Sequence, residues 1–429
     1  MREPDEHHPA FSARVREVKR ISARKVGLLS ALYFVQGMPF GFQSTALPVY
    51  LRMQGVSLKA ISFIGVLALP WMLKALWAPL VDRYGSTRIG PRKSWILPMQ
   101  AGLALACATA ALVVEQGSLP VLLGLIFLMN LFAATQDIAV DGLAVKLLVE
   151  PHELGWGNTA QVVGYKLGML TGGGLLVWAS AHIGWSGLFL AMALLSLGVF
   201  AVVALSREPV RTGDAAERPA WREISERLLA VARLPGTLWL LLFIGTYKLG
   251  ESMVDVLFKP FLLDAGITPA QIGLWVGTWG TVASVLGSVA GGLVVSRMPL
   301  LGALALTACL RVFPLGGEWL LALHGPTQAG VIAITAAENF FGGMLTTAMF
   351  AFMMSRVDRR IGATHYTLLA SIEVLGKAPG GPIAGLLATD AGWSYANVFL
   401  LGTVLSVLFV ALLLPLRQAP PPQPVSPGV

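Results

Sequence analysis

The chain alternates long apolar stretches with short polar intervals along most of its length. About 20 apolar residues in a helix cross the roughly 30 Å hydrocarbon core of a bilayer. The pattern therefore predicts an all-α membrane protein with twelve transmembrane helices. The predicted spans lie near 28–50, 59–81, 95–114, 120–146, 157–181, 185–206, 237–263, 270–296, 299–322, 327–355, 363–388 and 393–415.

A polar interval over residues 207–235 interrupts this rhythm and predicts a cytoplasmic linker between two six-helix halves, 28–206 and 236–416. The halves resemble each other, because 47–67 aligns with 258–278 and 184–197 aligns with 392–405. Repeats of this kind build many secondary transporters, with the solute site between the halves. A cytoplasmic N-terminal tail is expected over 1–27 and a disordered, Pro-rich tail over 417–429.

The composition and the distribution of charge are typical of a membrane protein. The chain is 55% hydrophobic and 13% charged, and its formal net charge is +8. The basic residues gather on one side of the predicted topology, whereas the opposite loops carry only Arg52 and Lys59. Cytoplasmic loops carry such an excess of Lys and Arg, so we expect a protein of the cytoplasmic (inner) membrane with both termini in the cytoplasm. No aromatic platform accompanies the basic residues, which argues against a nucleic-acid partner.

Four charged residues lie within twelve positions of the span 237–263, namely Lys248, Glu251, Asp255 and Lys259. At 100° per residue they share one side of a helix. An ionisable group at the centre of a bilayer costs roughly 2.5–3.5 kcal/mol on insertion scales, so it faces the protein interior or a water-filled cavity. The stripe therefore predicts the lining of a solute pathway, and we expect Lys248 and Glu251 to form its inner pair.

Ionisable residues also interrupt five other predicted spans. Several have a structural alternative: Glu373 with Lys377 can be a neutral pair, and Asp137 with Asp141 can hold helix ends. Lys74 can reach the cytoplasmic surface, Lys259 can meet lipid headgroups, and Arg311 can reach the surface or contact the solute. The full set in these spans is Lys74, Asp137, Asp141, Lys166, Glu338, Glu373 and Lys377.

Two roles are assigned to these side chains. A carboxylate whose protonation responds to its surroundings can carry a proton across the membrane, and the candidates are Asp137, Asp141, Glu251, Asp255, Glu338 and Glu373. Cations and hydrogen-bonding groups can bind an anionic solute, and the candidates are Tyr33, Gln36, Gln43, Gln161, Lys166, Tyr247, Lys248, Asn339 and Lys377. Neither a metal site nor a cofactor is expected, and the proton is the expected coupling ion.

Residues 78–93, APLVDRYGSTRIGPRK, follow directly after a span. This segment resembles the loop signature of the major facilitator superfamily, in which an acid at a helix end and loop arginines latch the cytoplasmic side. The matching residues are Asp82, Arg83, Gly85, Arg92 and Lys93. The equivalent segment of the second half, GGLVVSRMP, has a serine where the acid would stand.

Longer segments narrow the resemblance. LYFVQGMPFGFQSTALPVYLRMQGVSL, LPWMLKALWAPLVDR, QDIAVDGLAVKLL and GNTAQVVGYKLGML are similar to the branch that holds the AmpG muropeptide permeases, the RhtX/FptX siderophore permeases and the acetyl-CoA transporters. TYKLGE, FFGGMLTTAMF and ATHYTLLASIEVLGK are most similar to the group named major facilitator superfamily domain-containing protein 3. The resemblance covers roughly residues 28–400 and implies the major facilitator fold.

The sequence thus predicts a monomeric secondary active transporter in the lipid bilayer. It is expected to import an organic anionic or zwitterionic solute, of the acyl-CoA, muropeptide or siderophore class, together with protons by alternating access. Two alternatives stay open, namely an exporter of the same fold and a receptor that binds solute without moving it. No nucleophile–base or metal set indicates an enzyme, and a channel would not need two repeats with alternating charges.

Overall fold

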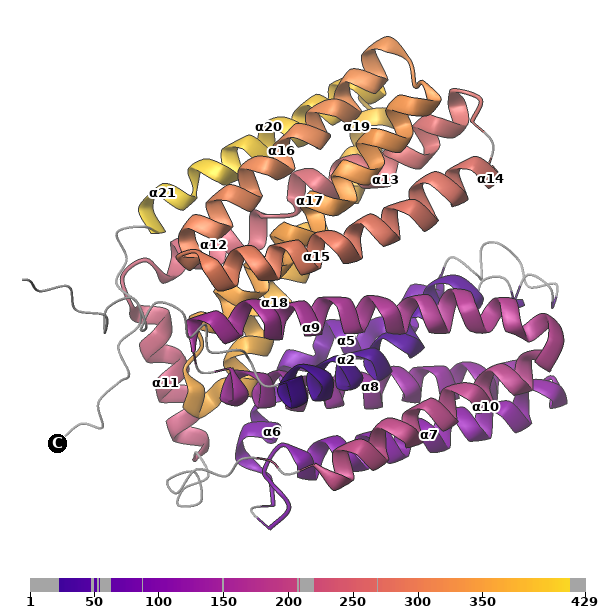
Figure 1. Cartoon of the computed structure of the whole chain (residues 1–429), viewed down its shortest axis with the longest axis vertical. Helices are drawn as coiled ribbons and strands as arrows, with labels where there is room; N and C mark the ends of the chain where they lie inside the picture. Colours follow the sequence, from indigo (N-terminus) through magenta and orange to yellow (C-terminus); the bar gives the residue numbers. More distant parts are fainter. Residues whose placement is uncertain are drawn as a thin grey trace, which may run out of the picture.

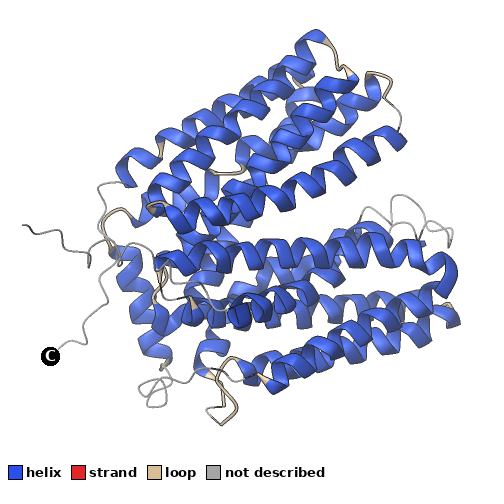
Figure 2. Cartoon of the chain, viewed as in Figure 1, coloured by secondary structure: helices blue, strands red, loops and turns tan. Residues whose placement is uncertain are grey.

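A computed structural model describes residues 23–47, 50–51, 54, 63–86, 88–148, 150–206, 208, 220–267 and 269–416. Within these ranges the regular elements are all helical (Figure 2). Several predictions fall outside them: the N-terminal tail up to residue 22, the loop residues Arg52 and Lys59, most of the linker, and the C-terminal tail.

The N-terminal half is a bundle of helices, several of which are broken. Its first predicted span is a helix that continues into a π-helical turn, and its second is a series of short turns. The elements are α2 (Ala23–Gly41), η1 (Phe42–Ala46), η2 (Phe63–Ala68), α5 (Leu69–Leu73), η3 (Lys74–Leu76), α6 (Ala78–Arg83), α7 (Lys93–Gln116), α8 (Leu119–Leu147), α9 (Pro151–Leu170), η4 (Thr171–Leu175) and α10 (Leu176–Leu205).

The C-terminal half repeats this design. The elements are α12 (Thr237–Thr246), α13 (Leu249–Asp264), α14 (Pro269–Ile272), η5 (Gly273–Trp279), α15 (Gly280–Arg297), α16 (Leu300–His324), α17 (Gln328–Ser355), η6 (Arg359–Ile361), α18 (Gly362–Lys377), α19 (Gly380–Thr389), α20 (Tyr395–Ala411) and α21 (Leu413–Leu416). The predicted linker contains a further helix, α11 (Trp221–Arg233).

Each predicted span falls on helical elements, but not every one is a long, unbroken helix. By length and composition, seven helices of the described residues could each cross a membrane. The number is eight if Trp221–Arg233 and Thr237–Asp264, which meet at 87°, count as one span. The all-helical fold is thus established, and the count of twelve spans stays a prediction.

Glycines at equivalent places support the internal repeat. Gly184 and Gly392, which the alignment pairs, both have a left-handed backbone, with φ of 72° and 65°. Only glycine adopts this conformation without strain, so both halves turn the chain in the same way before their last long helix. The register also pairs Gly173 with Gly381, and each packs against the first predicted span of its own half. A Cβ on Gly173 would lie 2.9 Å from the carbonyl carbon of Gly41 in α2, and one on Gly381 would lie 3.1 Å from Val256 in α13.

The two halves meet at one end of the molecule and diverge towards the other (Figure 1). We call the end where α11 lies the linker end. One apolar core at this end joins residues of both halves, among them Leu143 and Ala363. Farther along, the N-terminal half has a separate core around Phe189 and the C-terminal half has one around Phe399. The shared core holds the halves together only at the linker end.

Helices α9 and α15 approach each other closely between the halves. A Cβ on Gly155 would lie 2.9 Å from the backbone nitrogen of Ser296, so only glycine fits there. One turn farther along, the Thr159 hydroxyl donates a hydrogen bond to the Ser288 carbonyl oxygen at 3.2 Å. Small residues allow helix backbones to approach closely within a membrane, as Gly155 does in this seam between α9 and α15.

Candidate functional site

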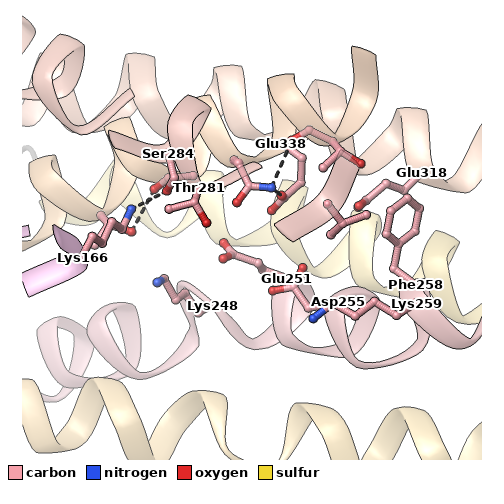
Figure 3. Close-up of a pocket in the computed structure, with 15 residues that line it drawn as sticks. Lys166, Lys248, Glu251, Asp255, Phe258, Lys259, Thr281, Ser284, Glu318 and Glu338 are labelled. Carbon is pink, nitrogen blue, oxygen red and sulfur yellow. Dashed lines mark hydrogen bonds between the residues drawn. The ribbon is translucent and has the colours of Figure 1, made fainter. Parts of the chain in front are cut away.

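A cavity of about 470 Å³ lies along α13, where most of the predicted charged residues converge. The chain leaves helical geometry between α12 and α13, since Lys248 has φ −112° and ψ 5°. This break begins α13 at the cavity and turns its charged face inwards (Figure 3). The cavity is lined by Lys166, Lys248, Glu251, Asp255, Phe258, Lys259, Val276, Thr281, Ser284, Glu318, Thr335, Glu338, Asn339, Gly342 and Thr346.

Arg311 of α16 organises the acidic side of the cavity. Its Nε donates to Glu251 Oε2 at 3.2 Å, and its Nη2 forms a close ion pair with Glu338. Its Nη1 also donates to the Glu338 carbonyl oxygen at 2.8 Å, while Asn339 Nδ2 donates to Glu338 Oε2 at 2.6 Å. Glu251 is therefore paired with Arg311, while Lys248, the other expected residue of the inner part of the stripe, lines the same cavity. Arg311 is 2% exposed, which also excludes a reach to the membrane surface.

Two lysines form the basic side of the cavity. Lys166 comes from α9 of the other half and donates a hydrogen bond to the Ser284 hydroxyl. The Lys248 ammonium lies 5.5 Å from the centre of the Tyr247 ring. Among the described residues, no carboxylate lies within ion-pair distance of either lysine. Figure 3 shows both ammonium groups at one end of the cavity, so that end can accept an anionic group.

Two carboxylates on the acidic side lack a cation. Asp255, which the stripe predicts, lines the cavity without an ion pair in the described part of the chain. Glu318 of α16 was missed by the sequence analysis. It is 2% exposed, and its Oε2 has no hydrogen-bond partner among the described residues. The signal that could have found Glu318 was its spacing of seven from Arg311, which places both on one face of a helix.

A second charged cluster lies inside the N-terminal half. Lys74 forms a close ion pair with Asp137, and each side chain is 9% exposed. The expected reach of Lys74 to the cytoplasmic surface is therefore wrong. Asp141 accepts hydrogen bonds from the Tyr33 hydroxyl at 2.7 Å and from Gln161 Nε2 at 3.3 Å. These candidates are held by one another and none of them lines the cavity.

The remaining candidates are distributed around these two clusters. Lys377 donates to Glu373 at 3.2 Å, as the neutral-pair alternative expects, and the Tyr247 hydroxyl donates to the same oxygen at 3.2 Å. Gln43 accepts a hydrogen bond from Asn130 at 2.6 Å. Gln36 is fully buried, and neither end of its amide has a partner within the described ranges. The structure thus brings Lys166, Lys248, Glu251, Asp255, Lys259, Glu338 and Asn339 to one cavity and leaves the other candidates outside it.

Asp82 of the loop signature connects the two halves at the linker end. Its carboxylate accepts the backbone N–H of Ala363 at 3.3 Å and of Thr364 at 2.7 Å, at the beginning of α18. It also forms a close ion pair with Arg92. A carboxylate at a helix N-terminus satisfies unpaired N–H groups and the helix dipole, so Asp82 of one half caps a helix of the other.

The basic residues of the signature have separate tasks. Lys93 Nζ donates to the carbonyl oxygens of Ala204 and Ser206, both at 2.7 Å. The Arg83 guanidinium lies 5.5 Å from the ring centres of Tyr84 and Trp221, and Trp221 begins α11. A hydrogen bond from Arg83 lowers the pKa of the Tyr84 phenol. Gly85 is needed for space, since a Cβ there would lie 2.7 Å from the Pro91 carbonyl oxygen.

Two helical halves that meet at one end beside a charged cavity are the arrangement of the major facilitator fold, and solved structures agree with this fold. The outward conformation of the transporter FucP matches with a TM-score of 0.70 at 15% identity, covering 92% of this chain and 99% of FucP. The human organic anion transporter MFSD10 (TETRAN) matches with a TM-score of 0.71 at 16% identity, covering 91% and 99%.

Sequence comparisons then give the family. The family model for acetyl-coenzyme A transporter 1 matches residues 25–122 and 108–183. The anhydromuropeptide permease of Escherichia coli (strain K12) is 30% identical over 397 residues, which cover 91% of this chain and 79% of the permease. The putative transporter AmpG 4 of Rickettsia conorii is 28% identical, with 89% and 94% covered. The chain belongs to the AmpG permease and acetyl-CoA transporter branch of the major facilitator superfamily. It is a transporter and not an enzyme.

Proposed function

We propose that this protein imports an organic anionic or zwitterionic solute together with protons, by alternating access. The observation that carries the proposal is the separation of charge in the cavity. Lys166 and Lys248 lie at one end without a carboxylate partner in the described residues, and acids gather beyond them (Figure 3). An anionic group of the solute binds the two lysines, while a proton is carried by a carboxylate of the acidic side.

Charge balance gives a reason for coupling the solute to a cation. The cavity and its organising arginine hold equal numbers of basic and acidic side chains, namely Lys166, Lys248, Lys259 and Arg311 against Glu251, Asp255, Glu318 and Glu338. Charge that is unbalanced in a low-dielectric site is costly. An anion that binds alone leaves the cavity negative, whereas an anion that binds with a proton leaves it neutral.

Uptake into proteoliposomes under an imposed pH gradient tests the coupling. We expect solute accumulation that follows the gradient and collapses with a protonophore. The double variant Glu251→Gln/Glu373→Gln should lose this dependence, because it removes two of the candidate proton carriers. Glu115→Gln, at the exposed end of α7, is the matched control and should behave as wild type. Uptake indifferent to the gradient, or the same in the double variant, would overturn proton coupling.

The class of solute is proposed from chemistry and relatives together. A permease 30% identical to this chain is named for an anhydromuropeptide, and a structural neighbour is an organic anion transporter. We propose a muropeptide, acyl-CoA or siderophore type of solute. A thermal-shift screen of the purified protein against these three classes tests this, with Lys248→Ala in parallel. A true ligand should stabilise the wild type and stabilise Lys248→Ala much less.

We also propose a monomer in the inner membrane, with the linker end in the cytoplasm. The excess of basic residues in the loops of that side supports this orientation. Labelling of a single cysteine at position 220 by an impermeant maleimide tests it: only inverted vesicles should react.

Counterflow of solute would exclude a receptor that binds without transport. Measurement of net flux in both directions would separate import from export.

A further inference from the structure

Three carboxylates converge at the centre of the cavity. Glu251 and Asp255 come from α13 and Glu338 comes from α17, and one oxygen of each lies within 4.8 Å of the other two. Hard cations bind carboxylate oxygens at about 2.3–2.6 Å, so two ligands of one ion lie up to about 5 Å apart. A single small ion can therefore contact all three residues, which the sequence did not predict.

Hydrogen bonds hold Glu251 and Glu338 in place and leave several oxygens of the cluster free. Arg311 occupies Glu251 Oε2 and Glu338 Oε1, and Asn339 occupies Glu338 Oε2. No donor reaches Glu251 Oε1 or either oxygen of Asp255 within the described part of the chain. Glu251 and Glu338 are thus oriented by neighbours that do not use up their lone pairs, as second-shell partners orient metal ligands.

Glu318 provides a second, independent observation. It is 2% exposed, and its Oε2 has no hydrogen-bond partner among the described residues. Its carboxylate points into the cavity on the side where Asp255 and Glu338 lie (Figure 3). A buried polar group without a partner costs about 1–3 kcal/mol, and more when it is charged. A cation bound beside it would remove this cost.

We propose that Glu251, Asp255 and Glu338 bind Na⁺, with Glu318 as an additional carboxylate facing the ion. All of these ligands are hard oxygens, which suit alkali and alkaline-earth ions better than transition metals. A monovalent ion is favoured over a divalent one because Arg311 already neutralises part of the charge of two of the ligands, so a divalent ion would add more positive charge than a singly charged solute can balance. The inference rests on the proposed function in one respect: an anionic solute at Lys166 and Lys248 requires one added positive charge, which Na⁺ at this site supplies in place of the proton.

Binding of radioactive Na⁺ to the purified full-length protein tests the proposal. The protein is kept in detergent at a fixed, mildly alkaline pH, without solute, and choline chloride holds the ionic strength constant. We expect saturable binding that unlabelled Na⁺ displaces and that K⁺ and Ca²⁺ displace far less well. Thermal unfolding in the same buffers should show a rise in Tm with Na⁺ and none with choline.

Variants assign the site. Asp255→Asn should abolish Na⁺ binding, and Glu318→Gln should weaken it about tenfold, as loss of an outer partner does. In choline, Asp255→Asn should keep the wild-type Tm and Glu318→Gln should keep or raise it, since neither carboxylate has an ion pair in the described residues. Glu115→Gln, far from the cavity, should bind Na⁺ normally. Unsaturable binding, preferential displacement by Ca²⁺, or full binding by Asp255→Asn would each overturn the proposal.

This experiment is separate from the test of proton-coupled uptake. Na⁺ binding is measured without solute and without a gradient, so a failure of pH-driven uptake leaves the result intact. Conversely, a protein that accumulates solute with protons but binds no Na⁺ would overturn only the cation site.

Discussion

Single buried ion pairs give the sharpest predictions at the scale of residues. Lys74 and Asp137 are both nine-tenths buried and pair with each other. Removing one partner of a buried pair leaves an uncompensated charge, which costs roughly 3–5 kcal/mol. We expect Lys74→Met to lower the Tm of the purified protein strongly.

The double variant Lys74→Met/Asp137→Leu is the control for this pair. It removes both charges and should recover much of the lost stability, because replacing a buried ion pair by apolar groups is often neutral or stabilising. Equal melting temperatures for wild type and Lys74→Met would show that Lys74 reaches solvent instead.

Part of the candidate site could be predicted from residue patterns alone. Helical periodicity placed Lys248, Glu251 and Asp255 on one face, and that face does line the cavity. The partner of Glu251 was not predictable in this way, because Arg311 lies 60 positions away on α16. Which helices face each other is set by packing between them, and no local period carries that information. Glu318 was missed for the same reason.

At the scale of elements, the contact between α9 and α15 depends on glycine. A Cβ on Gly292 would lie 2.8 Å from the Gly155 carbonyl oxygen and 3.0 Å from Thr159 Cβ. We expect Gly292→Leu to separate the halves at the linker end. Met354, which contacts Asn158 of the other half at 3.9 Å and is 5% exposed, reports this opening. In a background without native cysteines, Met354→Cys should react faster with maleimide when Gly292→Leu is present.

A matched glycine provides the control for that experiment. Gly198 lies in α10, and a Cβ there would meet nothing within 4 Å. Gly198→Leu should therefore leave the labelling rate of Met354→Cys unchanged. If both leucine variants label alike, the seam between α9 and α15 does not hold the halves together.

Loss of an ion pair of helix α11 should have only a small effect on the transport rate, although α11 contacts both halves. Arg227 Nη1 lies 3.0 Å from Asp358, and Glu223 lies 2.5 Å from Arg360. Partly exposed ion pairs contribute about 0.2–1 kcal/mol each. We expect Glu223→Arg to change the transport rate by about threefold or less, and the charge swap Glu223→Arg/Arg360→Glu to restore it. A loss of transport in Glu223→Arg beyond about tenfold would mean that α11 does more than clamp the halves.

The bounds of a helix were predictable from the sequence where an apolar stretch defines them, and less so where a helix is broken within such a stretch. The apolar stretch 299–322 corresponds closely to α16, Leu300–His324. The stretch 363–388 was expected to be continuous, yet the structure divides it into α18 and α19 at Ala378 and Pro379. Proline next to glycine signals such a break, so this one could have been predicted. The break at Lys248 carries no such signal, because lysine is an ordinary helix former.

The whole molecule must open at the linker end if solute is to cross, and a disulfide can test this. Val145 of α8 and Gly362 of α18 belong to different halves, and a Cβ on Gly362 would lie 3.6 Å from Val145 Cβ. Disulfides form at Cβ separations of about 3.5–4.5 Å. We expect Val145→Cys/Gly362→Cys, with Cys107 and Cys309 replaced by serine, to cross-link on mild oxidation. Oxidised protein should lose transport and regain it after reduction, whereas each single-cysteine variant should transport under both conditions.

The cross-linked protein also separates binding from movement. The shared apolar core lies at the linker end, and the halves diverge towards the other end (Figure 1). A bond between α8 and α18 therefore fixes the arrangement that already exists and leaves the charged residues along α13 in place. Solute binding, measured by thermal shift, should survive oxidation while counterflow is lost. If the oxidised protein still exchanges solute at the wild-type rate, the halves do not move apart at the linker end during transport, and alternating access by this motion is wrong.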